Sequence, residues 1–202
     1  MNCMSVAIQA GGSSTRMGVN KAMMSFLGEP LIARVARLVT PITRDVFIIS
    51  NEPQEYQEFG LRVVSDVVAN MGAIGGLYTA VVQAECEFVG VVACDMPFVN
   101  PAILTAGFEL LVANHADVAI PKTAEGYEPL HAVYRKEPCA LAIKSAMDAG
   151  KRRLVAWLNE VNVIEIGVDL IEQYDPNRLS FINTNTIDEF LQAVEIGKKL
   201  EK

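Results

Sequence analysis

Short apolar segments rich in β-branched residues alternate along this chain with longer amphipathic segments, and this alternation limits the fold more than any other feature. Five apolar segments, each expected to form a strand, cover residues 4–9, 45–50, 61–66, 88–94 and 117–121. Helical patterns lie between them, near 30–40, 53–59, 73–85 and 100–114. Nearly continuous apolar strands separated by helices indicate a parallel sheet covered on both faces. We therefore predict a three-layer α/β fold built from βαβ units.

The later part of the chain has a different pattern. Residues 128–135 resemble a strand entered through Pro129, and residues 161–168 a further strand. Helices are expected near 138–149 and 152–160, and a strand end over 180–186. Thr186 and Glu189 have the spacing of a capping box at the start of a last helix, 187–201. Because the chain has no repeat, low-complexity tract or linker, we predict one domain over residues 1–202.

The chain is acidic overall but locally basic. It has 202 residues, 51% of them hydrophobic, and a formal net charge of −7. This composition supplies a sizeable core, and the acidic balance argues against a nucleic-acid-coating protein. Residues 1–50 nevertheless carry five basic and two acidic residues. An acidic protein that handles an anionic substrate needs a local basic pocket, and we expect it in this first quarter.

The cysteines and the N-terminus indicate a cytoplasmic protein. None of the four cysteines belongs to a C-x-x-C pair, and the first residues lack the basic region of a signal peptide. No apolar stretch is long enough to span a membrane. We expect all four cysteines to be reduced, mostly as small buried hydrophobic residues.

A glycine-rich loop follows the first predicted strand, with the sequence AGGSSTRMGVNK over residues 10–21. Its spacing excludes a Walker A loop and the G-x-G-x-x-G dinucleotide fingerprint. Its glycines would still let backbone N–H groups approach an anion, and it would lie at the carboxyl edge of the sheet, where open α/β folds bind ligands. Arg16 and Lys21 could bind phosphate oxygens. The alternative is a plain surface connection with both cations solvated.

The full pattern of this loop resembles the signature of the molybdenum cofactor guanylyltransferase family, within the nucleotidyltransferase superfamily. That signature reads [LV]-A-G-G-x-S-x-R-M-G-x-x-K. The matching residues are Ala10, Gly11, Gly12, Ser14, Arg16, Met17, Gly18 and Lys21. Only Gln9 departs, because an aliphatic residue is usual there. The related cytidylyltransferases typically read A-A-G where this chain reads A-G-G, so Gly12 favours guanine over cytosine.

The resemblance extends over most of the chain. Segments that resemble family motifs are GEPLI (28–32), IISN (48–51), VVSD (63–66), GAIGGL (72–77), ACDMPFV (93–99), EPLHAVY (128–134) and FINTNT (181–186). Ala73 and Ile187 stand where the family has Pro, and Gly75 stands where it has Ala. The resemblance implies a Rossmann-like nucleotidyltransferase fold, with residues 1–121 as the nucleotide-binding part and 122–202 as the acceptor-binding part.

The residues expected to bind the nucleotide gather around four predicted strand ends. The resemblance implies the nucleotide-binding residues Ala10, Gly11, Gly12, Lys21, Asn51, Asp66, Gly72 and Asp95. Nucleotidyl transfer needs charge neutralisation, so Arg16, Lys21 and Asp95 are expected to be catalytic. Asp95 follows a buried strand, and the resemblance implies that it is the Mg²⁺ ligand, with Asn183 or Asn185 completing the site. Without the resemblance, Asp95 could be a turn residue, and Asn51 and Asp66 a strand-end cap and a turn.

The acceptor-binding residues are expected in the later part of the chain. They are His131, Lys151, Arg152, Arg153 and Asn183. The basic run 151–153 would face the acceptor's phosphate, or would be a solvated face at the start of a helix. His131 would line the acceptor pocket, or would be a strand histidine satisfied by its neighbours.

The resulting prediction is a Mg²⁺-dependent enzyme that transfers GMP from GTP to molybdopterin and releases pyrophosphate. Its partners would include cofactor-biosynthesis proteins and molybdoenzymes, but neither nucleic acid nor a membrane. Two alternatives stay open. One is a sister enzyme that uses CTP or another phosphorylated acceptor, such as a sugar phosphate or phospholactate. The other is a GTP-binding accessory protein without catalytic activity.

Overall fold

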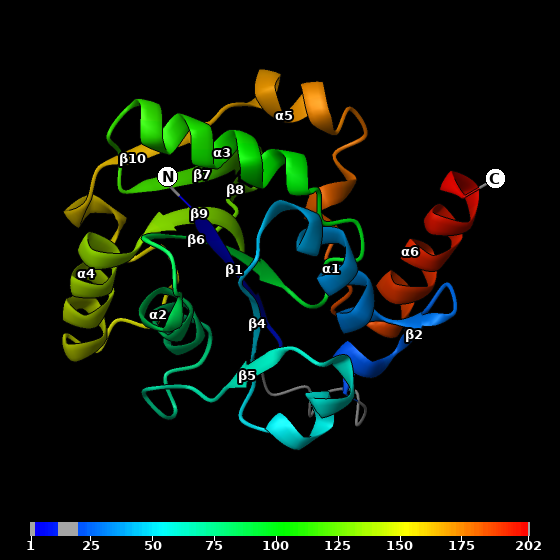
Figure 1. Cartoon of the computed structure of the whole chain (residues 1–202). Coiled ribbons are helices and arrows are strands. Elements are labelled where there is room, and N and C mark those ends of the chain that lie inside the picture. The colour runs from blue at the N-terminus through cyan, green and yellow to red at the C-terminus, as the bar shows by residue number, and fades with distance from the viewer. Residues whose placement is uncertain (1–2, 12–19, 202) are drawn as a thin grey trace.

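An eight-stranded sheet forms the centre of the molecule (Figure 1). The structure is a computed structural model that describes residues 3–11 and 20–201. The strand order is β10-β7-β9-β6-β1-β4-β5, with β8 paired to β7. The strands are β1 (Met4–Gln9), β4 (Val46–Ile49), β5 (Arg62–Val64), β6 (Phe88–Ala93), β7 (Val118–Thr123), β8 (Gly126–Tyr127), β9 (His131–Arg135) and β10 (Val163–Ile166). Of the described strands of this sheet, only β8 and β9 run antiparallel to the others, so the predicted mostly parallel sheet is confirmed.

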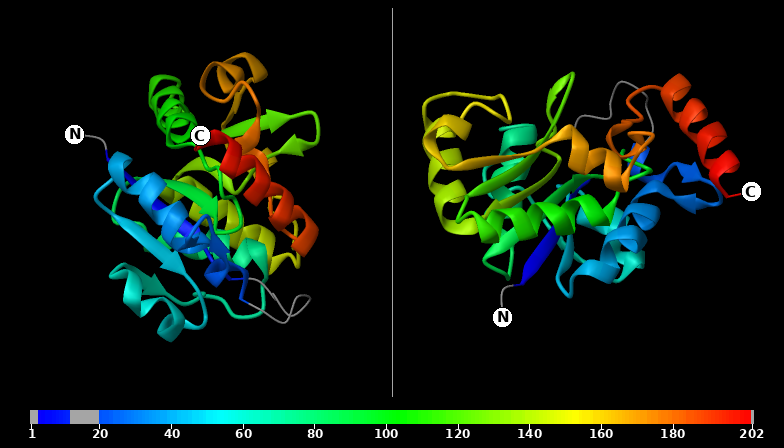
Figure 2. Two further views of the ribbon diagram at one scale, coloured as in Figure 1. Left: turned by 90° about the vertical axis from the view of Figure 1, so that its right-hand side faces the viewer. Right: turned by 90° about the horizontal axis from the view of Figure 1, so that it is seen from above.

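Helices cover both faces of this sheet, which confirms the three layers. The helices are α1 (Leu31–Val39), α2 (Ala73–Gln83), α3 (Pro101–Ala113), α4 (Lys136–Asp148), α5 (Val168–Tyr174) and α6 (Ile187–Leu200). Buried residues of α1, α3 and α5 share one hydrophobic cluster with the sheet, and those of α2 and α4 share a second. Figure 2 shows the same separation from two further sides.

β1 shows why the apolar segments are nearly continuous. All six of its residues are buried. Val6 and Ile8 face the first cluster, whereas Ala7 faces the second, because successive strand residues point to opposite faces. β4 and β6 flank β1 in parallel. A strand with neighbours on both sides and helices on both faces excludes polar side chains except at its ends.

The parallel strands bring several loops to one edge. β1, β4, β5 and β6 all end there, so residues 10–11, 50–52, 65–72 and 94–100 lie along the same carboxyl edge. β9 begins at this edge as well, since the Ala93 N–H donates to the Leu130 carbonyl over 3.2 Å. Polar residues far apart in the sequence are therefore neighbours here.

A short hairpin and the last helix form a unit beside the sheet that the sequence analysis partly missed. The hairpin consists of β2 (Ser25–Phe26) and β3 (Glu29–Pro30), and α6 lies against it (Figure 1). Phe26 and Phe190 meet edge to face with their ring centroids 6.0 Å apart. Gly197 allows close packing, because a Cβ there would lie 2.7 Å from a methyl carbon of Leu27. The predicted capping box of Thr186 and Glu189 is confirmed.

Three local predictions were wrong or incomplete. Residues 53–59 form a 3-10 helix, η4 (Pro53–Phe59). Residues 152–160 form turns that end in η5 (Leu158–Glu160), because the fully buried Trp157 packs on Tyr134 and donates to the Leu154 carbonyl. The expected strand over 180–186 is instead η6 (Leu179–Phe181) followed by extended chain. Its Thr184 bonds to the Asp95 carbonyl rather than to a sheet neighbour.

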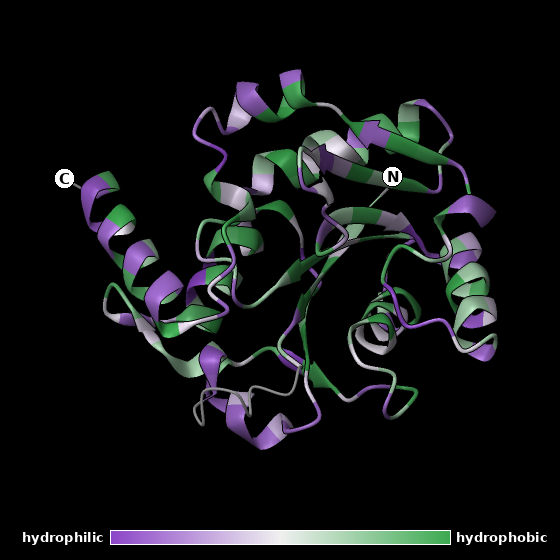
Figure 3. Ribbon diagram, turned by 180° about the vertical axis from the view of Figure 1, so that it is seen from behind, coloured by the Kyte–Doolittle hydropathy of each residue, from purple (hydrophilic) through white to green (hydrophobic). Residues whose placement is uncertain are grey.

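The expectation of four reduced cysteines is also wrong. Cys3 and Cys86 form a disulfide, whereas Cys94 and Cys139 are free. The pair is brought together because Cys3 directly precedes β1 and Cys86 lies two residues before the adjacent strand β6. In Figure 3 the strands are mostly hydrophobic and the outer faces of the helices carry hydrophilic residues. Among the described residues, no helix has the length and apolar character needed to cross a membrane.

Candidate active site

A cleft of about 290 Å³ opens at the carboxyl edge of β1, β4 and β5. Its lining comes from the loops that follow these strands and from the start of α2. The lining residues are Ala10, Gly11, Asn20, Ser50, Asn51, Glu52, Tyr56, Asp66, Asn70 and Gly72. Five of the predicted nucleotide-binding residues, Ala10, Gly11, Asn51, Asp66 and Gly72, thus line a single cleft.

Asn51 and Asp66 bond to each other across the cleft wall. The Asn51 amide donates to the Asp66 carboxylate over 2.9 Å, and the Asp66 backbone N–H donates to the Asn51 side-chain oxygen over 2.9 Å. Because both bonds come from the side chain of Asn51, its amide plane is fixed relative to the loop that follows β5. Such a pair presents oriented acceptors and donors to a ligand.

The turn before α2 forms another wall of the cleft. Gly72 has a φ of +64°, a conformation that favours glycine. Its carbonyl accepts hydrogen bonds from the backbone N–H groups of Gly75 and Gly76, which starts the helix. Asn70 also has a positive φ, +60°, which Asn tolerates better than most residues.

Lys21 and Asp95 lie beside this cleft, and each contacts one of the neighbouring residues Thr184 and Asn185. Lys21 begins the 3-10 helix η2 (Lys21–Met23), where the Asn20 side chain accepts from the Ala22 N–H. The Lys21 ammonium lies 3.5 Å from the side-chain oxygen of Asn185. Asp95 occupies the turn after β6, and its backbone carbonyl accepts from both the N–H and the hydroxyl of Thr184, over 3.0 and 3.1 Å.

The environment of the Asp95 carboxyl favours the binding of a cation. Burial raises the pKa of the Asp95 carboxyl above its ordinary value, and the positive charge of Lys21 opposes this rise. A partly buried carboxylate with raised pKa gains from a nearby cation. Burial also raises the pKa of the adjacent Cys94 thiol, so Cys94 has no thiolate character at neutral pH.

Asp95 would be the main protein ligand of any metal ion bound here. Among residues 3–11 and 20–201, no three His, Cys, Asp or Glu side chains gather to hold a metal ion. A closed, all-protein metal cage is therefore absent from this part of the chain. The side-chain oxygen of Asn185, which lies near Lys21, is a second candidate ligand.

The basic run of residues 151–153 lies in a loop, not at the start of a helix as expected. All three side chains belong to exposed residues. Lys151 forms an ion pair with Glu160 at 3.6 Å. Arg152 donates to the Asn70 carbonyl over 2.6 Å, so this run touches the loop that borders the cleft.

His131 and Asn183 have structural partners. His131 is fully buried, its Nε2 lies 3.2 Å from the Asn100 carbonyl, and its ring packs on Phe181. Burial lowers the pKa of His131 to about 4. This burial favours a core histidine over a contact with the acceptor, although its Nδ1 has no hydrogen-bond partner among the described residues. The Asn183 amide donates to the Phe181 carbonyl over 3.3 Å.

Several residues of the first quarter that were expected at the site lie elsewhere or fall outside the described residues. Gly12 and Arg16 fall outside the described residues. Arg34 and Arg37 both pair with Glu29 beside the hairpin. They therefore do not contribute to the basic pocket, whose described cation is Lys21.

Sequence reasoning missed the polar side chains of Asn20 and Tyr56. The Asn20 amide donates to the Tyr56 hydroxyl over 3.0 Å and also bonds to Glu55. Asn20 sits one residue before Lys21, where an Asn that caps a helical turn is a recognisable signal. Tyr56 gives no such signal, because an aromatic residue in an amphipathic segment predicts core packing.

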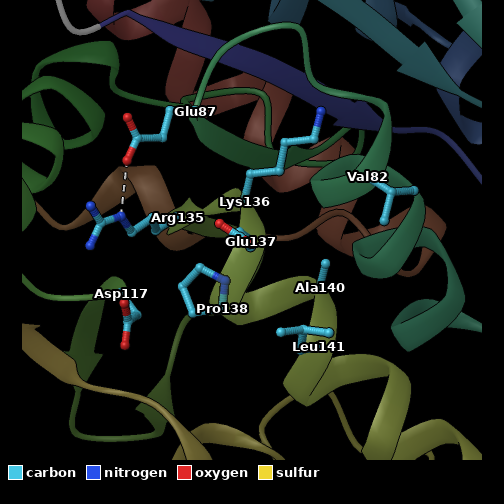
Figure 4. A pocket seen from close by; sticks show the side chains of 9 residues that line it. All are labelled: Val82, Glu87, Asp117, Arg135, Lys136, Glu137, Pro138, Ala140 and Leu141. Atoms are coloured by element: carbon cyan, nitrogen blue, oxygen red, sulfur yellow. Dashed lines mark hydrogen bonds and ion pairs between the residues drawn. The ribbon is translucent and has the colours of Figure 1, made fainter.

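A larger hollow of about 790 Å³ lies at the opposite, amino edge of the sheet (Figure 4). Several of its charged groups already have partners: Glu87 pairs with Arg135 at 3.0 Å, and Lys136 donates to the Ala84 carbonyl. None of the predicted site residues lines this hollow, although it is larger than the cleft. The volume of a cavity alone therefore does not identify the active site.

Comparison with known proteins identifies the family. Residues 6–162 match the model of the MobA-like NTP transferase domain. The chain belongs to this family. A probable molybdenum cofactor guanylyltransferase from Natranaerobius thermophilus is 32% identical to it, over 98% of each chain. A second, from Natronomonas pharaonis, is 36% identical over 93% of this chain and 95% of its own.

A solved structure agrees with this membership of the MobA-like NTP transferase family. Molybdopterin-guanine dinucleotide biosynthesis protein A from Archaeoglobus fulgidus has a TM-score of 0.85 and 28% identity to this chain. The match covers 97% of this chain and 100% of that one. The predicted nucleotidyltransferase fold is thereby confirmed, and the chain is a nucleotidyltransferase homologue along almost its whole length.

Proposed function

We propose that this protein transfers GMP from GTP to molybdopterin, forming the guanine dinucleotide form of the cofactor and pyrophosphate. The observation that carries the proposal is that the Asn51–Asp66 cleft and the Lys21–Asp95 pair lie at one edge of the sheet. The names of the relatives from Natranaerobius and Natronomonas support a guanylyl group and the molybdenum cofactor as the two parts that the reaction joins.

The reaction is a displacement at phosphorus. A phosphate oxygen of the acceptor forms a bond to the α-phosphorus of GTP, while the bond to the β-phosphate oxygen breaks and pyrophosphate leaves. Both substrates are anionic, so the protein must hold them in line and neutralise charge. In this proposal Arg16 and Lys21 neutralise the triphosphate, and Ala10, Gly11, Gly12, Asn51, Asp66 and Gly72 hold the nucleoside.

Mg²⁺ is the proposed cofactor, and the residues present fit it. This ion commonly binds through one or two carboxylates together with substrate phosphate oxygens, so a single partly buried carboxylate such as Asp95 is sufficient on the protein side. Asn183 or Asn185 would complete its surroundings. When bound, the ion supplies charge neutralisation at the phosphates.

The acceptor is proposed to bind on the side of residues 122–202, where Lys151 and Arg153 offer cations to its phosphate. The cytoplasm remains the proposed compartment, because both substrates are phosphorylated metabolites of biosynthesis. Cofactor-biosynthesis proteins and molybdoenzymes are the proposed protein partners that supply the acceptor and receive the product.

The test is a pyrophosphate-release assay with Mg²⁺, molybdopterin and each NTP in turn. Release with GTP supports the proposal. Release with CTP would favour the sister enzyme, and GTP binding without release would favour the accessory protein.

A further inference from the structure

Gln9 is a buried polar residue at the end of the central strand, directly before the cleft. It is only 6% exposed. Its backbone is fixed on both sides, because its carbonyl accepts from the Cys94 N–H over 3.1 Å and it lies in register with Ile49 of β4. Its side chain shares the face of β1 that α2 covers. An aliphatic residue would fit this position without a hydrogen-bonding requirement, so the amide calls for an explanation.

The Gln9 amide contacts the first turn of α2. Its Nε2 donates to the Ala73 carbonyl over 3.2 Å. Gly76 leaves the space that the amide occupies, since a Cβ on Gly76 would lie 2.2 Å from Nε2 and 2.6 Å from Cδ. The side chain thus connects the end of β1 to the start of α2. These two elements continue into Ala10 and Gly72, which line the cleft.

The other half of the amide is left unsatisfied. Among residues 3–11 and 20–201, the buried Oε1 atom of Gln9 has no hydrogen-bond partner. A buried acceptor without a donor costs free energy of folding. Gln9 is therefore a poor choice for stability alone, and its contact with the α2 turn points to a role in ligand binding.

We propose that Gln9 is a positioning residue for the nucleotide, acting through the turn of residues 72–76. It does not line the cleft itself. By holding Ala73, it sets the distance between the two walls that carry Gly11 and Gly72. The inference rests on the proposed function for the identity of the ligand, GTP, but not for the contact between Gln9 and α2.

The direct test is the Gln9→Met variant, which keeps the length of the side chain and removes both polar atoms. We expect the Kd for GTP, measured by calorimetry with Mg²⁺ on the full chain, to rise roughly three- to tenfold, as for the loss of one hydrogen bond. The Tm should stay equal or rise. Hydrogen exchange of the amides of residues 75–77 should become faster.

The matched control is Ser5→Ala. Ser5 is fully buried on the same face of the same strand, but its hydroxyl accepts from the Cys86 N–H at the far edge. This variant should leave the Kd for GTP within about twofold. An unchanged Kd in Gln9→Met would overturn the proposal. A lower Tm, with weaker GTP and acceptor binding together, would show a merely structural role and would overturn it too.

A second pair of variants tests the contact itself. Gly76→Ala should lower the Tm in the wild-type background, because the new Cβ displaces the Gln9 amide. In a Gln9→Ala background the same change should lower the Tm much less. Equal losses in both backgrounds would contradict the contact. A wild-type protein that binds GTP but releases no pyrophosphate would refute the proposed function while leaving the Gln9 result valid.

Discussion

Asn51 and Asp66 hold each other by two hydrogen bonds of 2.9 Å at the mouth of the candidate nucleotide cleft. One residue follows β4 and the other follows β5, so the pair locks two neighbouring loops together. Both residues line the cleft, so their remaining hydrogen-bonding capacity would be available to a ligand bound there.

The Asn51→Ala variant should lose nucleotide affinity with little loss of stability. Both bonds disappear, so we expect the KM for GTP to rise about tenfold, equivalent to about 1.4 kcal/mol. The Tm should change little because Asn51 is exposed. Asn114→Ala, which removes an exposed amide from the end of α3, is the control. Equal KM values in wild type and Asn51→Ala would show that the pair does not contact the nucleotide.

The Lys21→Ala variant should affect turnover far more than folding. Removal of a cation aimed at developing charge costs on the order of 100-fold in kcat, whereas a partly exposed lysine contributes at most about 1 kcal/mol to stability. Steady-state pyrophosphate release and thermal unfolding separate the two effects. Lys144→Ala, on the outer face of α4, should leave both unchanged. Unfolding of Lys21→Ala would contradict the catalytic assignment.

Substitutions of the neighbouring residues Arg152 and Arg153 should raise the KM values of different substrates. Arg152 donates to the carbonyl of Asn70, a residue of the nucleotide cleft. Arg152→Met should therefore raise the KM for GTP several-fold, and Arg153→Met should raise the KM for the acceptor instead. Each variant is the control for the other in a two-substrate kinetic analysis. A rise in the acceptor KM alone for Arg152→Met would assign it to the acceptor's phosphate.

His131 should make folding stability depend on pH. Burial lowers its folded-state pKa to about 4 from 6.5, so the unfolded chain binds a proton between these values that the folded protein does not. Stability is thus complete above pH 6.5 and falls as the pH decreases toward 4, by on the order of 3 kcal/mol. Urea unfolding at several pH values measures this slope.

The matched variants for this pH dependence are His131→Gln and His115→Asn. Gln cannot be protonated, so the first variant should show a flatter pH dependence even where its absolute stability is lower. His115 is exposed and has a positive φ that Asn tolerates, so the second should keep the wild-type slope. The same slope in wild type and His131→Gln would refute the assignment.

The sequence predicted the layered sheet and five of the residues that line the cleft, because both depend on strand order. β1, β4 and β6 are continuous buried runs and β5 is half-buried, and each is followed by a polar or glycine-rich segment that parallel pairing must bring to one edge. The sequence could not predict contacts that depend on packing across the fold. The disulfide of Cys3 forms because β1 and β6 are neighbours, and His131 packs against Phe181, a residue 50 positions away in the sequence. Residues 152–160 form turns instead of the expected helix because Trp157 packs against Tyr134.

The proposed guanylyl transfer is tested most directly by pyrophosphate release from the wild-type protein and from Asp95→Asn, with molybdopterin, Mg²⁺ and either GTP or CTP. Asn keeps the size of Asp95 and removes the charge that would hold the ion. We expect release with GTP by the wild type, little with CTP, and at least a 100-fold lower rate for a folded Asp95→Asn. Release by Asp95→Asn at the wild-type rate, or release with CTP in place of GTP, would contradict the proposal.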